Sequence, residues 1–362
     1  VRVTLGERAS VTDSGGRYEI SPVAKGQYNL VAEKPGYETA SIQNIVVGDT
    51  EVKQDITIKR NLKGKILFAR ANVVDKNFFG FSVVDANGTR VTPLTNLFDE
   101  QPTWSPDGAR IIFSRSENNT PRQIYTMSSL GGIATNLSGR NQNDRSPAWS
   151  SDGQRIAFVH AEILEPSAVY IMDANGQNRI RLAECDQNAK PTWSPDGTQI
   201  AFSRKAEHEK GVNLDLFVLD INAFIAGKNE PNNPPPNPPN PPPVDENQPE
   251  VGVKRLTTNP EDDIHPDWSP DGSKLAFTSQ VNSTNANVYI FDLFTGLQSL
   301  LTDGVSYNGY PCWSPDGTKV AFSSSRDGSF GIWVIDADGS NMTRIYDNLG
   351  EDELLRQHGW HE

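Results

Sequence analysis

The sequence predicts an all-β fold: a six-bladed β-propeller closed by its C-terminal strand and preceded by a small β-sandwich. The main observation is a P-x-W-S-P-D-G phrase that occurs five times, once with Ser replacing the second Pro. Its tryptophans are Trp104, Trp149, Trp193, Trp268 and Trp313, which are 45, 44, 75 and 45 residues apart. A period in the middle forties with about four short strands per unit is typical of a propeller.

Each repeat is expected to contain four strands. The S-P-D-G segment favours a tight turn, because Gly tolerates a positive φ. An alternating strand should follow, at 111–113, 156–158, 200–202, 275–277 and 320–322. Third strands such as 169–172 and 332–335 are rich in β-branched and aromatic residues. The fourth strands are expected to end near Leu182, Leu256 and Leu301.

The proline two residues before each tryptophan removes a ladder donor. It is acceptable if this first strand is the innermost of its blade, with a free edge toward the central channel. Proline and tryptophan would then point to the same face. We expect the tryptophans to pack between neighbouring blades, and ligand stacking is the alternative.

The count of six blades comes from the two ends of the repeat region. Residues 64–70 (GKILFAR) match the second strand of a repeat, but no W-S-P-D-G precedes them. The chain ends with the missing piece, Gly359-Trp360, 47 residues after Trp313. The C-terminal strand should therefore complete the first blade, which predicts a propeller over residues 62–361 without open sheet edges.

Residues 1–60 are expected to form a separate β-sandwich. The segments GGRYEI at 15–20 and KGQYNLVAEKPGYET at 25–39 are followed by the alternating segment 46–58. These features resemble the carboxypeptidase regulatory-like domain, a small transthyretin-like sandwich with an adhesive or spacer role. The resemblance implies that the first strand is missing, since the chain starts where that family's second strand would be.

The propeller repeats resemble those of the TolB family, which carry P-x-W-S-P-D-G followed by an I-A-F-like strand. The resemblance covers roughly residues 62–361. It implies a repeat type found in periplasmic scaffolds, in cell-surface proteins and in the propeller half of prolyl-oligopeptidase-like enzymes. TolB itself has a mixed α/β domain before its propeller, and this chain does not. Both resemblances imply export to a prokaryotic periplasm or cell surface.

The composition narrows the classes of partner. The formal net charge is −13, and all of the acidic excess lies beyond residue 60, because residues 1–60 hold eight basic and eight acidic side chains. A net acidic surface argues against nucleic acid and anionic membranes. The sequence contains no run of eighteen or more apolar residues, and it therefore predicts no membrane-spanning segment. Cys185 and Cys312 fall in different blades, so we expect no disulfide.

Residues 229–249 form a Pro/Asn-rich tract that interrupts the fourth blade and explains the long 75-residue spacing. Such a tract cannot hold a sheet and should run as polyproline II or irregular chain. It is either a tolerated surface loop or a ligand for a proline-recognising groove.

The variable loops between second and third strands, at 70–80, 115–123, 160–168, 204–214, 280–287 and 324–331, should gather on the face opposite the S-P-D-G turns. If the protein has a binding face, we expect this one. Five residues before each tryptophan stand oxygen-bearing side chains: Asp99, Asp144, Asn188, Asp263 and Asn308. Repeat symmetry could place them in a ring at the channel mouth. Such a ring would suit Ca²⁺ or a basic group of a partner, and hydrogen bonding to each residue's own turn is the alternative.

Signals for catalysis are poor. The sequence has no G-x-S-x-G, no H-E-x-x-H, no C-x-x-C and no phosphate loop, and the five histidines are scattered. His160 and His208 begin equivalent loops of adjacent blades and are the only pair considered for a joint metal site.

The sequence therefore predicts a non-catalytic, exported scaffold that needs no cofactor and binds another macromolecule, a protein, through its variable-loop face. Two alternatives remain open. One is a carbohydrate-binding or carbohydrate-cleaving propeller, which would use aromatic residues such as Phe78, Phe79, Tyr307, Tyr310 and Phe330. The other is a structural subunit of a surface layer or filament.

Overall fold

The computed structural model describes residues 1–13, 16–33, 39–56, 64–72, 78–95, 99–117, 120–139, 143–161, 166–209, 211–228, 251–304, 306–347 and 353–361. The chain divides into two compact units, Val1–Lys63 and Gly64–Glu362. The Pro/Asn tract at 229–249 lies outside the described residues. No helix in the described part of the chain is long and apolar enough to cross a membrane.

The first unit contains one antiparallel sheet in the order β2-β1-β3-β4. Its strands are β1 (Arg2–Leu5), β2 (Arg8–Val11), β3 (Gly26–Glu33) and β4 (Ala40–Val47). Alternate residues of these strands, among them Val3, Leu5, Leu30 and Ala32, form a small buried core. The likeness of this unit to a carboxypeptidase regulatory-like domain stays a prediction.

The described part of the second unit forms six four-stranded sheets, which we call blades 1 to 6. Blade 1 consists of β28 (Glu353–His361), β5 (Lys65–Asn72), β6 (Phe78–Asp85) and β7 (Val91–Pro93). Blade 2 consists of β8 (Asp99–Trp104), β9 (Arg110–Arg115), β10 (Gln123–Ser128) and β11 (Thr135–Asn136). Blade 3 consists of β12 (Asp144–Trp149), β13 (Arg155–His160), β14 (Ala168–Asp173) and β15 (Ile180–Glu184). Blade 4 consists of β16 (Thr192–Trp193), β17 (Gln199–His208), β18 (Gly211–Asp220) and β19 (Val253–Arg255). Blade 5 consists of β20 (Asp262–Trp268), β21 (Lys274–Asn282), β22 (Asn285–Asp292) and β23 (Gln298–Leu300). Blade 6 consists of β24 (Asn308–Trp313), β25 (Lys319–Ser324), β26 (Gly331–Asp336) and β27 (Thr343–Asp347).

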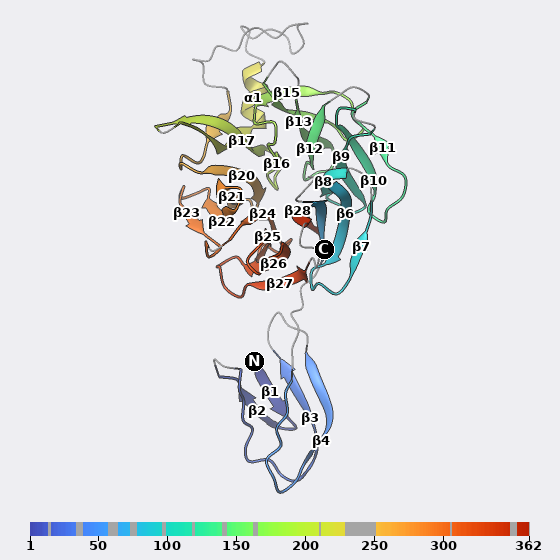
Figure 1. The fold of residues 1–362 in the computed structure, drawn as a ribbon, viewed down its shortest axis with the longest axis vertical. Helices are drawn as coiled ribbons and strands as arrows, with labels where there is room; N and C mark the ends of the chain where they lie inside the picture. Colours follow the sequence, from blue (N-terminus) through green and yellow to red (C-terminus); the bar gives the residue numbers. More distant parts are fainter. Residues whose placement is uncertain are drawn as a thin grey trace. The chain divides into compact units, whose positions relative to one another are not determined.

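The first strands of the blades form the inside of a ring. Each contacts the first strand of the next blade, and β28 contacts both β24 and β8. Figure 1 shows β8, β12, β16, β20, β24 and β28 around the middle of this unit, with β7, β11, β23 and β27 at its periphery. The C-terminal strand β28 pairs with β5, as the Gly359-Trp360 segment predicts. The ring is therefore closed by the two ends of the repeat region.

The repeated tryptophans pack between blades, as expected. Trp193 lies in one core cluster with residues of blades 3 and 4, and Trp268 does the same for blades 4 and 5. Trp313 joins blades 5 and 6 in the same way. The middle strands contribute a fully buried phenylalanine in each repeat: Phe68, Phe113, Phe158, Phe202, Phe277 and Phe322.

The proline before the tryptophan is accommodated by a β-bulge, a feature that the sequence analysis did not foresee. In four blades the residue before this proline has a left-handed backbone, with φ between 52° and 55°: Gln101, Ser146, His265 and Tyr310. The strand register shifts at the same place, so the proline is not required to donate to the ladder.

Two regions differ from the expected organisation. Residues 204–214 and 280–287 were expected as loops, yet most of them extend the hairpins β17–β18 and β21–β22 by paired strand residues. A short helix, α1 (Ile221–Lys228), follows β18 directly. The expectation of loops failed because these segments contain no Pro and a single Gly, Gly211, which stands at the start of β18 and does not interrupt the strands.

Candidate functional site

The candidate site lies where the inner strands begin, on the side that also carries the β17–β18 and β21–β22 hairpins. We call this side the loop face, and the side of the S-P-D-G turns the turn face. Four of the five predicted site residues stand on the loop face at or near the start of an inner strand, and their side chains are buried. They are Asp99, Asp144, Asp263 and Asn308.

Blades 2 and 3 hold their buried carboxylates with cations of the same blade. Arg115 donates from Nε and Nη2 to the two oxygens of Asp99, over 2.6 and 2.9 Å. Arg179 donates to Asp144 over 2.6 and 2.8 Å, and His160 Nδ1 lies 2.7 Å from Asp144 Oδ1. Burial alone would raise the pKa of Asp144, but Arg179 and His160 outweigh it and lower the pKa.

Blades 5 and 6 treat the same position differently. Asp263 accepts a hydrogen bond from Asn259 Nδ2 over 2.7 Å and has no cationic partner among the described residues. Burial raises its pKa to about 7, and the hydroxyls of Ser279 and Thr257 offset this only in part. Asn308 is neutral and accepts from Ser324 Oγ over 2.7 Å. These two blades therefore bury a weak acid and an amide where blades 2 and 3 bury ion pairs.

In blade 4 the predicted residue Asn188 is exposed, and its backbone N–H donates to Asp186 Oδ1 over 2.8 Å. The buried carboxylate of this blade is Asp215 on β18, which the sequence analysis missed. Asp215 is paired with Arg255 and lies 3.2 Å from His208 Nε2. A signal was available, because Asp215 shares its strand face with Phe217 and Leu219, where an unpaired charge would be costly.

The structure does not bring the five predicted residues into one cluster of ligands. Asp99, Asp144, Asp263 and Asn308 each face a residue of their own blade across the strand pair, namely Arg115, His160, Ser279 and Ser324. His160 and His208 likewise belong to two separate pairs. Among the described residues, no group of three or more His, Cys, Asp or Glu side chains could hold a metal ion. The calcium ring stays a prediction.

Aromatic side chains gather beside the inner strands of blades 5 and 6. The rings of His265 and Tyr310 are stacked with centroids 4.1 Å apart, and Tyr307 meets Phe330 edge-on at 5.7 Å. Tyr307 and Tyr310 share a buried cluster with Ala286. Of the aromatic residues expected here, Tyr307, Tyr310 and Phe330 come together, whereas the side chains of Phe78 and Phe79 lie outside the described residues.

The inner strands of blades 2 and 3 carry charge at the corresponding place. Arg122 pairs with Glu100 over 2.6 Å, and Arg145 Nη2 donates to Asn143 Oδ1 over 3.0 Å. Burial, together with the charge of Arg122, lowers the pKa of Arg145. The loop face is therefore charged at blades 2 and 3 and aromatic at blades 5 and 6.

The two cysteines are both free and buried, in agreement with the expected lack of a disulfide. Burial raises the pKa of both thiols, which disfavours the reactive thiolate form.

Comparison with known proteins agrees with this architecture. The family profile of the TolB β-propeller domain matches residues 65–225 and 250–354. An uncharacterised protein of Agrobacterium fabrum is 35% identical over 101 residues, which are 28% of this chain and 34% of that protein. The chain thus spans about a third of the length of this relative.

Two solved structures share the fold. The crystal structure of TolB from Acinetobacter baumannii has a TM-score of 0.63 at 20% identity, over 83% of this chain and 67% of that chain. A chain in the crystal structure of a nidogen/laminin complex has a TM-score of 0.57 at 10% identity, over 82% of this chain and 97% of that chain. With its five tryptophan repeats in six closed blades and a profile match over most of its length, this chain belongs to the TolB β-propeller family.

Proposed function

We propose that this protein is a non-catalytic, exported scaffold that binds another protein on its loop face. The observation that carries the proposal is a pair of exposed valines on the two long hairpins. Val212 on β18 is 60% exposed and Val281 on β21 is 59% exposed. Two ordered hairpins that carry exposed apolar side chains on the same face support a contact surface for another protein, if the two side chains belong to one contiguous patch.

The hairpin that carries Val212 is held in place by the segment that leads from blade 4 into blade 5. Leu214 N–H donates to Asp262 Oδ1 over 2.9 Å, and Asn213 Nδ2 donates to the carbonyl of Pro260. A hairpin fixed in this way loses little conformational entropy when a partner binds. The buried ion pairs of Asp99, Asp144 and Asp215 lie at the same face of blades 2, 3 and 4.

Export is part of the proposal. It rests on the family, whose TolB member gave the bacterial structure described above. The absence of a required cofactor and of catalysis likewise belongs to the proposal and follows from the lack of a catalytic motif in the sequence.

A carbohydrate-binding or carbohydrate-cleaving propeller is the second candidate. The aromatic group of His265, Tyr307, Tyr310 and Phe330 favours it, since sugar rings stack on aromatic faces. Tyr307 and Tyr310 are only 7% and 8% exposed, however, which leaves little ring surface for a sugar. A structural subunit of a surface layer or filament is a third candidate that the exposed hairpins would equally serve.

The test is crosslinking of the wild-type protein and of Val212→Glu and Val281→Glu to envelope proteins of the native host. Leu130→Glu, at an 89% exposed position on a turn of the opposite face, is the matched control. The proposal predicts one dominant crosslinked protein that is lost in the valine variants and kept in the control. Retention on cell-wall glycans without a crosslinked protein would support the carbohydrate candidate instead, and self-crosslinked ladders the filament candidate.

A further inference from the structure

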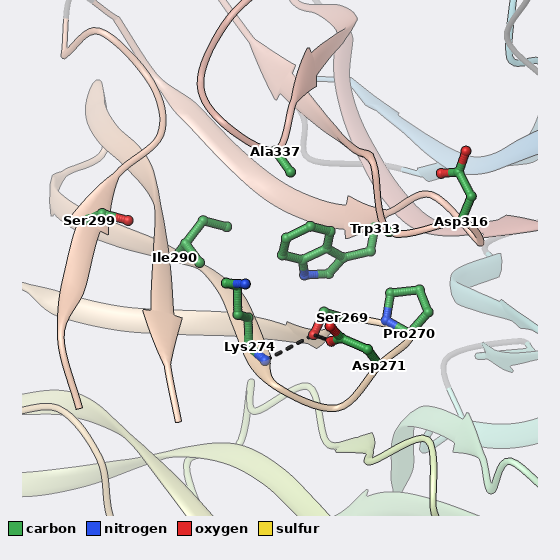
Figure 2. A pocket seen from close by; sticks show the side chains of 10 residues that line it. Ser269, Pro270, Asp271, Lys274, Ile290, Ser299, Trp313, Asp316 and Ala337 are labelled. Atoms are coloured by element: carbon green, nitrogen blue, oxygen red, sulfur yellow. Dashed lines mark hydrogen bonds between the residues drawn. The ribbon is translucent and has the colours of Figure 1, made fainter. Parts of the chain in front are cut away.

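The turn face carries a second feature, a cavity of about 460 Å³ between blades 5 and 6. We call it the 5–6 groove. Its lining includes Ser269, Asp271, Lys274, Ile290, Trp313 and Asp316. In the view of Figure 2 the Trp313 ring lies between Lys274 on one side and Asp316 on the other, with Ile290 beside it. The volume lies within the range of typical ligand pockets.

In two other grooves of this kind the corresponding space is occupied by an arginine of the chain itself. The guanidinium of Arg110 lies 4.7 Å from the Trp149 ring centroid, between blades 2 and 3. Arg155 lies 5.8 Å from the Trp193 ring centroid, between blades 3 and 4. Each of these arginines stands six residues after the tryptophan of its own blade. In blades 2 and 3, therefore, a cation lies over the tryptophan of the next blade.

The 5–6 groove lacks this arginine. The residue six positions after Trp268 is Lys274, and its backbone N–H donates to Ser269 Oγ over 2.9 Å. No stacking of Lys274 on Trp313 occurs in the described structure. A lysine differs from arginine here, since it has no planar guanidinium to lie on the indole.

The groove between blades 3 and 4 also receives an element with no counterpart in blade 6. Helix α1 places Ile221, Phe224 and Ile225 along it, and Phe224 packs against the core there. The remaining cavity is about 190 Å³. The 5–6 groove therefore has neither the arginine nor the helix that line the 3–4 groove.

Two carboxylates flank the open groove. Asp271 Oδ1 accepts three hydrogen bonds, from Ser269 Oγ and from the N–H and Oγ of Ser273. Asp316 is held in the same way by Ser314 and Thr318. In each case all of these bonds end on Oδ1, so Oδ2 is available to a cation. These hydrogen bonds lower the pKa of Asp271 to about 2. Burial alone would raise the pKa of Asp316, but the hydrogen bonds from Ser314 and Thr318 outweigh this and lower the pKa.

The surroundings of the groove also favour an extended segment of protein. Ser299 of β23 lines the groove, Leu297, two residues before it, is 70% exposed, and Phe294 of the preceding turn is 97% exposed. Trp313 Nε1 has no acceptor among the described residues, so a main-chain carbonyl could take its hydrogen bond. The same atom lacks an acceptor in Trp149 and Trp193. The missing arginine is what sets the 5–6 groove apart from the 2–3 and 3–4 grooves, and blades 4 and 6 likewise carry no arginine at this position, where Gln199 and Lys319 stand.

We propose that the 5–6 groove binds an arginine side chain from an extended, partly apolar segment of a partner protein, with the guanidinium over Trp313 and between Asp271 and Asp316. The bound arginine takes the place that Arg110 and Arg155 occupy in the filled grooves. The flanking apolar residues of the segment lie against Leu297.

The experiment measures binding of a labelled hexapeptide with one arginine between apolar residues, and of the same peptide with citrulline, by fluorescence anisotropy. The proposal predicts that citrulline weakens binding about tenfold or more, because the charge is lost while the shape is kept. Lys274→Arg should weaken binding by a similar factor, since the chain then fills its own groove. Arg155→Lys is the matched control and should leave the affinity unchanged.

Equal affinity for arginine and citrulline, an unaffected Lys274→Arg variant, or no binding at millimolar peptide would each overturn the proposal. Both variants carry a residue that other blades already use at that position, so loss of folding is not expected to obscure the result. Val212→Glu and Val281→Glu should bind the peptide normally, which separates this site from the one proposed on the loop face.

Discussion

Blades 3 and 4 and blades 5 and 6 are built from the same repeat, but the buried carboxylates of the first pair have cationic partners and the buried carboxylate at the start of the inner strand of blade 5 has none. Asp144 and Asp215 have arginine and histidine partners, and Arg155 covers Trp193. Asp263 has no cation among the described residues, and Lys274 does not stack on Trp313. The comparison shows that repeat symmetry supplies the scaffold, while departures from it at single positions give neighbouring blades different charges and a different groove.

The largest effect is expected when the buried ion pair between Asp144 and Arg179 is removed. Arg179→Ala should destabilise the protein by about 3 kcal/mol, because it leaves Asp144 buried with only His160 as partner. Since the pKa of Asp144 is lowered in the folded state, its stabilising effect is present above its unfolded pKa and is lost as the pH falls through the folded pKa. The difference between variant and wild type in urea unfolding should therefore shrink at low pH. A pH-independent difference would contradict the pairing.

The stability of the protein should depend on the ionisation of Asp263, which has no cationic partner among the described residues, in the opposite direction. Because the pKa of Asp263 is raised to about 7, the wild-type protein should lose stability as the pH rises from about 4 to about 7. Asp263→Asn should remove this slope and stabilise the protein at pH 8 by about 1–4 kcal/mol. Urea unfolding at pH 5 and pH 8 measures both quantities. Asp99→Asn is the matched control and should destabilise at both pH values, since it weakens the pair with Arg115.

The smallest effects are expected from substitutions at positions 155 and 274, which compare the 3–4 groove with the 5–6 groove directly. Arg155→Lys should cost about 0.5–1 kcal/mol by removing the guanidinium from the Trp193 ring. Lys274→Arg should stabilise by a similar amount, because it adds the missing stack on Trp313. Thermal unfolding of the two single variants and of the double variant provides the measurement. Effects of equal sign would show that the two grooves are not equivalent.

Much of the fold follows from the sequence because the repeat is strongly marked. The spacing of Trp104, Trp149 and Trp193 defines the blades, and Gly359-Trp360 marks the strand that closes the ring. The bulges could not be predicted in the same way. A left-handed backbone at Gln101 or Tyr310 depends on the strand pairing around it, and neither residue type favours that conformation by itself.

The candidate site was predictable in position but not in role. Counting back from each tryptophan located Asp99, Asp144, Asp263 and Asn308, yet their partners lie 16 residues later in the chain. Asp215 was missed because it stands on the third strand, outside the counted position. The cavity between blades 5 and 6 could not be predicted, because the difference between Lys274 and the stacked Arg110 and Arg155 becomes visible only when equivalent positions of folded blades are compared.

The most direct test of this account is a crystal structure of Lys274→Arg. The account predicts that the new guanidinium lies within about 6 Å of the Trp313 ring centroid and fills the cavity between blades 5 and 6. An arginine directed into solvent, with the cavity still open beside Trp313, would contradict the claim that this groove is an arginine site that the chain leaves empty.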